Sequence, residues 1–78
     1  MPMYLNLSGM SGVRAYEIGD DFIAVEFMAG RFRRYTYTHA ITGMQHVENM
    51  KVLASQGVGL NSYIRRHPDV NEGYARRA

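Results

Sequence analysis

Apolar and polar residues alternate in three successive stretches of the first half of the chain. These stretches are residues 13–18, 22–27 and 31–38, and the period of two is typical of strands with one buried face. A Gly-Asp-Asp turn separates the first two, which favours a tight reversal. The pattern therefore predicts an antiparallel meander of three strands. Residues 3–7 alternate in the same way and are the candidate for a fourth, edge strand.

Gly30 sets the expected register of the central hairpin. A three-residue loop commonly places its last residue in the left-handed region, where glycine avoids a Cβ clash. With residues 28–30 as the loop, Phe27 lies opposite Arg31 and Ile23 opposite Tyr35. A two-residue loop would turn an arginine toward the core, since a one-residue slip exchanges the faces. The expected core face is Ile23, Val25, Phe27, Tyr35 and Tyr37, and the outer face is Ala24, Glu26, Phe32, Arg34 and Thr36.

The period changes from two to three and four after residue 38. Apolar residues from Met44 to Ala54 follow the spacing of an amphipathic helix. Thr42 is the expected N-cap of this helix, and the glycines after it are expected to end it. A shorter second helix is expected to start near Leu60, with Leu60 and Ile64 facing inward, and to stop at Pro68.

The length of 78 residues predicts a single domain with a small core. We expect an α+β domain over residues 1–70, in which a three- to four-stranded antiparallel sheet carries one long and one short helix on one face. Residues 71–78 are polar and end in Arg-Arg-Ala, which predicts a flexible tail.

Cysteine is absent from the sequence, so disulfides and cysteine-ligated metals are excluded. This composition is compatible with a reducing, cytoplasmic location. The apolar runs are too short for a membrane span, and the N-terminal residues lack the features of a signal peptide. We therefore expect a cytoplasmic protein without a membrane partner.

The positive charge of the protein is carried almost entirely by arginine. The formal net charge is only +2, but eight of the nine basic residues are arginine. Arginine binds phosphate or carboxylate bidentately and stacks on aromatic rings. A bias toward G+C-rich codons explains the same composition equally well, so the arginines alone do not establish a nucleic-acid partner.

Several short motifs occur in a fixed order along the chain. A Tyr-x-Tyr strand follows a glycine, and a helix ending Ala-Ser-x-Gly precedes Asn-x-x-Ile-Arg. This order resembles that of the KTSC domain, a small module named from the C-terminus of some lysyl-tRNA synthetases. The resemblance covers roughly residues 8–67. The matching residues are Ser11, Tyr16, Ile23, Val25, Phe27, Gly30, Tyr35, Tyr37, Ala54, Ser55, Gly57, Asn61, Ile64 and Arg65.

The resemblance implies a stand-alone bacterial or phage member of that family. The family has no established activity, and RNA binding has been suggested for it. The resemblance also makes Tyr35 and Tyr37 the hallmark residues, either as a base-stacking platform or as core aromatics. The hairpin register favours the core. Ser55, Gly57 and Asn61 could bind an anion at a helix N-terminus, although helix capping is the commoner role for such residues.

A cluster of arginines is the main candidate for nucleic-acid binding, since phosphate contacts supply affinity without sequence readout. The alternative is a solvated surface with local ion pairs, such as Glu26 with Arg34. We predict binding of a transfer or structured RNA through this surface. The candidate residues are Arg31, Arg33, Arg34, Arg65 and Arg66.

Phe32 offers a second possibility, because the hairpin register points it outward beside Arg34. An exposed phenylalanine between arginines is typical of a single-strand binding surface. Residues 3–7 or a second subunit could cover it instead, which would make the protein an interaction module or a homodimer.

No constellation of catalytic residues is recognisable. His39, His46 and His67 lack the spacing of a metal site, and no phosphate-cradling glycine loop is present. We expect no enzymatic activity, no metal and no cofactor. A small hydrolase that uses a histidine is a third, unsupported class.

Overall fold

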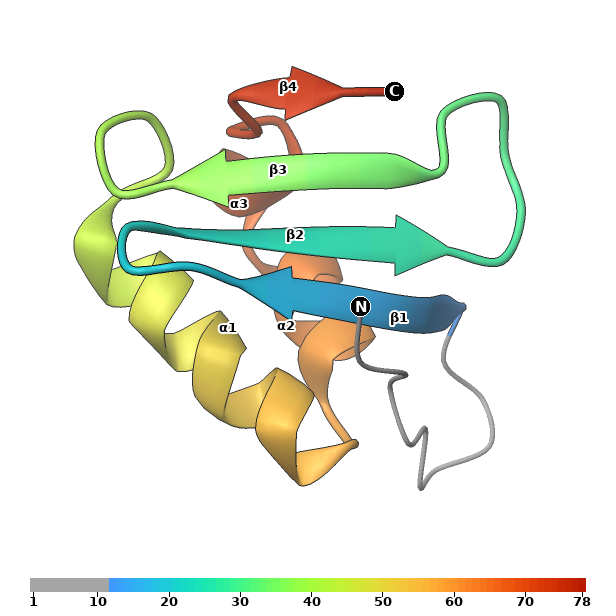
Figure 1. Cartoon of the computed structure of the whole chain (residues 1–78), viewed down its shortest axis with the longest axis horizontal. Helices are drawn as coiled ribbons and strands as arrows, with labels where there is room; N and C mark the ends of the chain where they lie inside the picture. The colour runs from blue at the N-terminus through green and yellow to red at the C-terminus, as the bar shows by residue number, and fades with distance from the viewer. Residues whose placement is uncertain (1–11) are drawn as a thin grey trace.

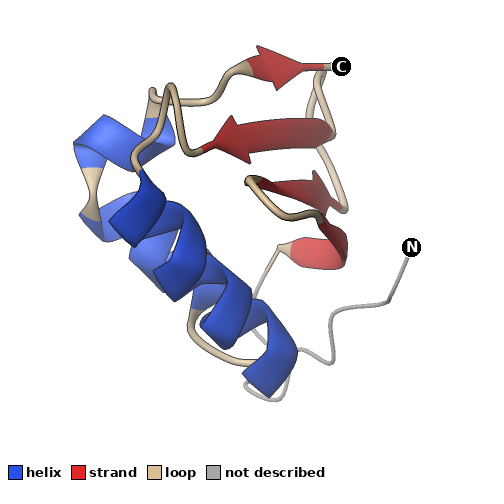
Figure 2. Cartoon of the chain, turned by 60° about the vertical axis from the view of Figure 1, so that its left-hand side comes forward, coloured by secondary structure: helices blue, strands red, loops and turns tan. Residues whose placement is uncertain are grey.

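The computed structural model describes residues 12–78 and consists of a sheet with helices on one face (Figures 1 and 2). Within these residues the sheet is four-stranded and antiparallel, in the order β1-β2-β3-β4. This confirms the predicted α+β class. The elements are β1 Val13–Ile18, β2 Phe22–Phe27, β3 Arg34–Thr38, α1 Met44–Gln56, α2 Leu60–Arg66, α3 Pro68–Asn71 and β4 Arg76–Arg77.

The predicted meander is confirmed in β1, β2 and β3. The bounds of β1 and β2 coincide with the first two alternating stretches. The Gly-Asp-Asp turn closes with a hydrogen bond of 3.0 Å from the Gly19 amide to the Phe22 carbonyl. The pairing of β1 with β2 is irregular between Val13 and Ala15, as at a β-bulge. The predicted strand at residues 3–7 lies outside the described residues.

The register of the β2–β3 hairpin differs from the prediction by two residues. Ile23 pairs with Tyr37 and Val25 with Tyr35, whereas the three-residue loop placed Ile23 opposite Tyr35 and Phe27 opposite Arg31. The longer loop closes with a hydrogen bond of 2.6 Å from the Phe27 amide to the Arg33 carbonyl. A slip of two residues preserves the face of every strand residue, so the predicted core face is unchanged. Arg31, Phe32 and Arg33 lie in the loop instead of in the strand. Phe32 is therefore not on the outer face of a strand beside Arg34, as predicted.

Gly30 has a φ of 116°, which is in the region that L side chains rarely adopt. Gly30→Val should therefore lower the free energy of unfolding by about 1–3 kcal/mol, because a β-branched residue is strained there. Thermal unfolding followed by circular dichroism measures this effect, and Ala29→Val in the same exposed loop is the matched control. An unchanged melting temperature for Gly30→Val would show that the loop relaxes to another conformation.

The two predicted helices form, but α1 begins differently from the prediction. Its N-cap is Gly43, not Thr42. The Thr42 hydroxyl instead donates a hydrogen bond of 2.6 Å to the Gly73 carbonyl. Gly57 ends the helix in the left-handed conformation, with a φ of 76°, as predicted. A cap assigned to Thr42 thus turns out to be a tether to the C-terminal segment.

Residues 71–78, predicted as a tail beyond residue 70, return to the sheet. Pro68 ends α2 as expected but also opens the short helix α3, since the ring fits the first helical turn. The chain then turns, and β4 pairs with β3. The Ala75 amide donates to the Thr36 carbonyl at 2.7 Å, and the Ala78 amide donates to the Arg34 carbonyl at 2.9 Å. These bonds satisfy backbone groups that would otherwise leave β3 as a bare edge.

The core lies between the sheet and the helical layer. Leu60 and Ile64 face inward, as predicted, and the largest buried side chain is Tyr37. Within residues 12–78, no helix is long and apolar enough to cross a membrane. The buried cluster comprises Val13, Ile23, Val25, Tyr37, Val47, Met50, Ala54, Leu60, Ile64 and Val70.

Candidate nucleic-acid interface

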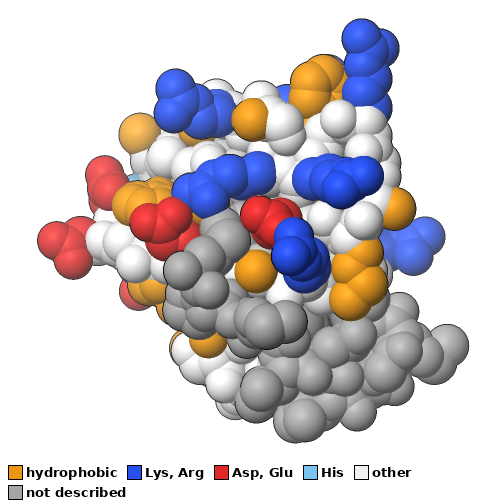
Figure 3. All heavy atoms as spheres, turned by 45° about the vertical axis from the view of Figure 1, so that its right-hand side comes forward, with side chains coloured by type: hydrophobic (Ala, Val, Ile, Leu, Met, Phe, Trp, Pro, Cys, Tyr) orange, Lys and Arg blue, Asp and Glu red, His pale blue; other side chains and the backbone are white. Residues whose placement is uncertain are grey.

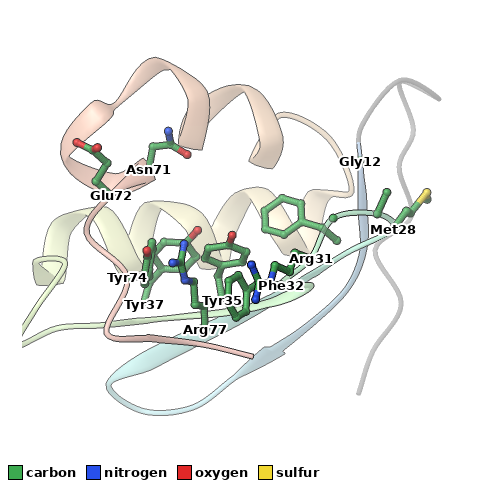
Figure 4. A pocket seen from close by; sticks show the side chains of 13 residues that line it. Gly12, Met28, Arg31, Phe32, Tyr35, Tyr37, Asn71, Glu72, Tyr74 and Arg77 are labelled. Atoms are coloured by element: carbon green, nitrogen blue, oxygen red, sulfur yellow. The ribbon is translucent and has the colours of Figure 1, made fainter.

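An open cleft of about 610 Å³ lies on the helical side of the sheet, at the end that carries the β2–β3 loop (Figure 4). The β2–β3 loop forms one wall, and the segment from α3 to β4 forms the other. Figure 4 shows Asn71 and Glu72 on the α3 side, apart from the rings that gather near β3. The aromatic and basic residues of the cleft are Phe27, Phe32, Tyr35, Tyr37, Tyr74, Arg31 and Arg77.

The rings at the base of the cleft are fixed by edge-to-face contacts. Tyr35 meets Phe27 at a centroid distance of 5.5 Å and Tyr74 at 5.0 Å. All three side chains are half-buried and pack against the core. Aromatic pairs in this geometry are favourable beyond the area that they bury. The cleft therefore has a rigid aromatic base that joins β2, β3 and the C-terminal segment.

Two arginines lie on the ring of Phe32 at the mouth of the cleft. The Arg77 guanidinium is 4.3 Å from the Phe32 centroid and 5.2 Å from that of Tyr74. The Arg31 guanidinium is 5.7 Å from the Phe32 ring. These are cation–π distances. Among residues 12–78, Arg14 and Arg34 form ion pairs with glutamates, whereas Arg31 and Arg77 form none. Both charges are therefore available to an anion.

Tyr35 and Tyr37 occupy different environments although both point to the core face. Tyr37 is 1% exposed, and burial raises the pKa of its phenol well above the usual value. Tyr35 is half-buried and lines the cleft. The position of Tyr37 agrees with the predicted core role, whereas Tyr35 both supports the core and forms part of the cleft.

The structure does not bring the candidate arginines together on one surface. Arg31 and Arg33 lie in the β2–β3 loop. Arg34 lies on the open face of β3, whereas Arg65 and Arg66 end α2 in the helical layer on the other face. The five residues thus divide into a group at the sheet and a separate pair on α2.

The open face of the sheet carries compensated charges, as Figure 3 shows by basic side chains with acidic ones between them. Arg34 binds Glu17 at 2.7 Å, and Arg14 binds Glu26 at 2.7 Å. The predicted pair of Glu26 with Arg34 does not form, although these residues are opposite one another in the register. Each glutamate instead pairs with an arginine from a different strand, which makes this part of the face a poorer phosphate surface than the cleft mouth.

The sequence did not predict that Tyr74, Arg76 and Arg77 are site residues. They fall in the stretch expected to be a tail, because a strand of two residues has no readable alternation. Tyr74 was the available signal, since a large aromatic residue in a polar stretch often packs against a core. The contact between Arg77 and Phe32 depends on the pairing of β4 with β3 and could not be predicted without it.

Ser55, Gly57 and Asn61, in and after α1, have local roles. The Ser55 hydroxyl donates to the Lys51 carbonyl in its own helix at 2.9 Å. Gly57 is the C-cap of α1, and the N-cap of α2 is Gly59, without a side-chain hydrogen bond from Asn61. This arrangement supports the capping interpretation for Gly57. It assigns no ligand to Ser55 or Asn61.

A hydrogen-bonded cluster centred on His46 joins the three helices. Its Nδ1 lies 2.7 Å from the Tyr63 hydroxyl, and its Nε2 lies 2.8 Å from an Asp69 carboxylate oxygen. Asn49 donates to the same hydroxyl at 3.2 Å, so the consistent assignment has Tyr63 donating to Nδ1 and Nε2 donating to Asp69. The bond from His46 lowers the pKa of Asp69. These bonds clamp α3 onto α1 and α2, and α3 leads directly to the cleft.

The histidines do not assemble a metal site in the described part of the chain. His46 and His67 lie at a ring-centroid distance of 5.3 Å, and His67 stacks on Tyr63 at 4.1 Å. His39 lies elsewhere and contacts Glu48 at 2.8 Å. Among residues 12–78 no group of three potential ligands could hold a metal ion.

Comparisons with known proteins identify no relative. No protein-family model, no curated protein and no solved structure matches the chain. The resemblance to the KTSC domain therefore stays a prediction from the sequence, and the function must be argued from the site.

Proposed function

We propose that the protein is a small binding module, without catalytic activity, that takes an unpaired stretch of RNA into the cleft. The observation that carries this proposal is the placement of Arg31 and Arg77 on Phe32 at the mouth of an open aromatic cleft. Stacking surfaces beside a basic rim are the two elements that single-strand binding requires.

Each element has a defined task in this proposal. A base stacks on the exposed part of the aromatic surface, and any base suits such a surface because every base has a π-face. The two guanidinium groups bind the adjoining phosphates, which supply affinity without sequence readout. Duplex RNA fits this site less well, because its bases are already stacked and its shape is read from outside.

The alternative, a protein partner seated on Phe32, has weaker support. The ring already carries the Arg77 guanidinium at 4.3 Å. An apolar partner would bury that charge, which is costly unless an acidic group pairs with it. A polyanion such as RNA would instead pair its phosphates with the Arg77 guanidinium.

The proposal predicts salt-dependent binding that requires the cleft mouth. Binding of a fluorescent, unstructured oligonucleotide should weaken steeply as salt rises, with a slope of about 0.7 per phosphate contact. Arg77→Gln should reduce this slope and weaken binding to all sequences alike. Phe32→Ala should cost roughly 1–3 kcal/mol of binding free energy, the usual value for one stacked base.

Arg65→Gln is the matched control, because Arg65 is exposed on α2 and outside the cleft. It should leave binding unchanged, and circular dichroism should show that all three variants keep the fold. Absence of salt-dependent binding by the wild-type protein to single-stranded, duplex or transfer RNA would overturn the proposal.

A further inference from the structure

We propose that the bound RNA strand crosses the edge strand β4, so that a phosphate next to the stacked nucleotide lies in a second groove on the open face of the sheet. This inference rests on the proposed function and adds a second phosphate site to it. The two sites lie on opposite faces of the sheet, because neighbouring side chains of β4 point to opposite faces.

Neighbouring residues on β4 serve opposite faces of the sheet. Arg77 pairs with Tyr35 and lines the aromatic cleft, whereas Arg76 pairs with Thr36 and lines a separate groove. Successive side chains of a strand point to opposite sides. The two arginines therefore flank one short strand, with one cation over each face.

The second groove has a volume of about 280 Å³ and a basic end. Arg34 and Arg76 line it together with the hydroxyl residues Thr36 and Thr38. Arg34 uses one terminal nitrogen for Glu17 at 2.7 Å, and a guanidinium has further donors to offer. Arg76 is exposed and takes part in no ion pair among residues 12–78.

The acidic residue of the groove is at the opposite end from Arg34. Asp21 and Phe22 adjoin Thr38, since Phe22 pairs with Thr38 and the Asp21 carbonyl accepts a hydrogen bond from the His39 amide. Arg34 begins β3, and Thr38 ends it. A phosphate would therefore be held near Arg34 and Arg76 and repelled from the Asp21 end, which fixes where the strand enters.

The position of β4 makes the crossing short. β4 is the last strand in the sheet order and only two residues long, and Figure 1 shows it along one rim of the sheet. A nucleic-acid strand leaving the cleft past Arg77 has only the width of this rim to pass before it reaches Arg76. The cleft and the second groove thus lie on one path around the rim.

The experiment compares a single nucleotide with a short unstructured oligonucleotide, by NMR titration and by anisotropy over a salt series. Arg76→Gln should leave the single-nucleotide affinity unchanged, because the cleft is intact. It should weaken binding of the oligonucleotide and lower the salt slope of that binding by about 0.7, which corresponds to the loss of one phosphate contact. The Thr36 amide should shift with the oligonucleotide only. Arg65→Gln is again the control.

The outcomes separate this inference from the proposed function. If Arg77→Gln weakens oligonucleotide binding but Arg76→Gln has no more effect than Arg65→Gln, the strand does not cross the rim and RNA binding stands. If Arg76→Gln weakens binding of the single nucleotide and of the oligonucleotide equally, Arg76 acts on the cleft, and the proposal that the strand crosses β4 is wrong. If the wild type binds neither probe, both proposals fall.

Discussion

Tyr37→Ala is expected to unfold the protein or to lower its free energy of unfolding by roughly 3–5 kcal/mol, the usual cost of removing a large buried ring. Tyr37 is the largest fully buried side chain and belongs to the main core cluster. The other residues of this cluster come from the sheet and from α1, α2 and α3, so a cavity here loosens both layers. A domain of this size has little stability in reserve.

Tyr37→Phe is the control for this prediction. It keeps the ring and removes only the hydroxyl, so urea denaturation should show a much smaller loss. Equal losses for the two variants would mean that the hydroxyl, not the packing of the ring, stabilises the fold. A melting temperature unchanged by Tyr37→Ala would contradict the assignment of Tyr37 to the core.

Gly73→Ala is expected to detach the C-terminal segment from the sheet. An added Cβ would overlap the carbonyl oxygen of Asp69, and backbone cannot yield as a flexible side chain does. The same residue accepts the Thr42 hydroxyl bond through its carbonyl. Overpacking of this kind costs about 1–3 kcal/mol, and we expect the loss to be concentrated in the turn that leads to β4.

Hydrogen exchange measures this loss locally. The amides of Ala75 and Ala78, which donate to the β3 carbonyls, should lose protection. The proposed RNA binding should weaken as well, because Tyr74 and Arg77 leave the cleft. Gly12→Ala is the matched control for the exchange of these two amides, since its added Cβ meets nothing within 4 Å. Full protection of both amides in Gly73→Ala would show that the turn adapts without releasing β4.

The sequence predicted best where a periodic pattern and a buried face coincide. The alternation of β2 located the strand and its core face, because Ile23 and Val25 have no other way to be buried. The faces of the hairpin were predicted correctly although the register was wrong, because a slip of two residues leaves each side chain on the same face of the sheet. Loop length was the weak point, because Gly30 fixes a positive φ but not the number of residues around it.

The cleft could not be predicted for a different reason. Its two walls are far apart in the sequence, and the wall with Tyr74 and Arg77 depends on β4. Thr42 illustrates the same limit, because a threonine before a helix is a typical N-cap. The neighbouring residues give no sign that its hydroxyl instead donates a hydrogen bond to the Gly73 carbonyl. For each of these residues, contacts with distant parts of the sequence determine its position and its partner.

The brevity of β4 has a consequence for the order in which the molecule opens. Its pairing with β3 closes a chain segment that contains α1, α2 and α3, so its formation must follow much of the fold. The chain regains the entropy of that closure when β4 opens. We expect β4 to exchange as a low-stability unit while the core remains folded. A ligand that contacts Arg77 would then add its binding free energy to this unit in particular. The cleft would be assembled in part by what it binds.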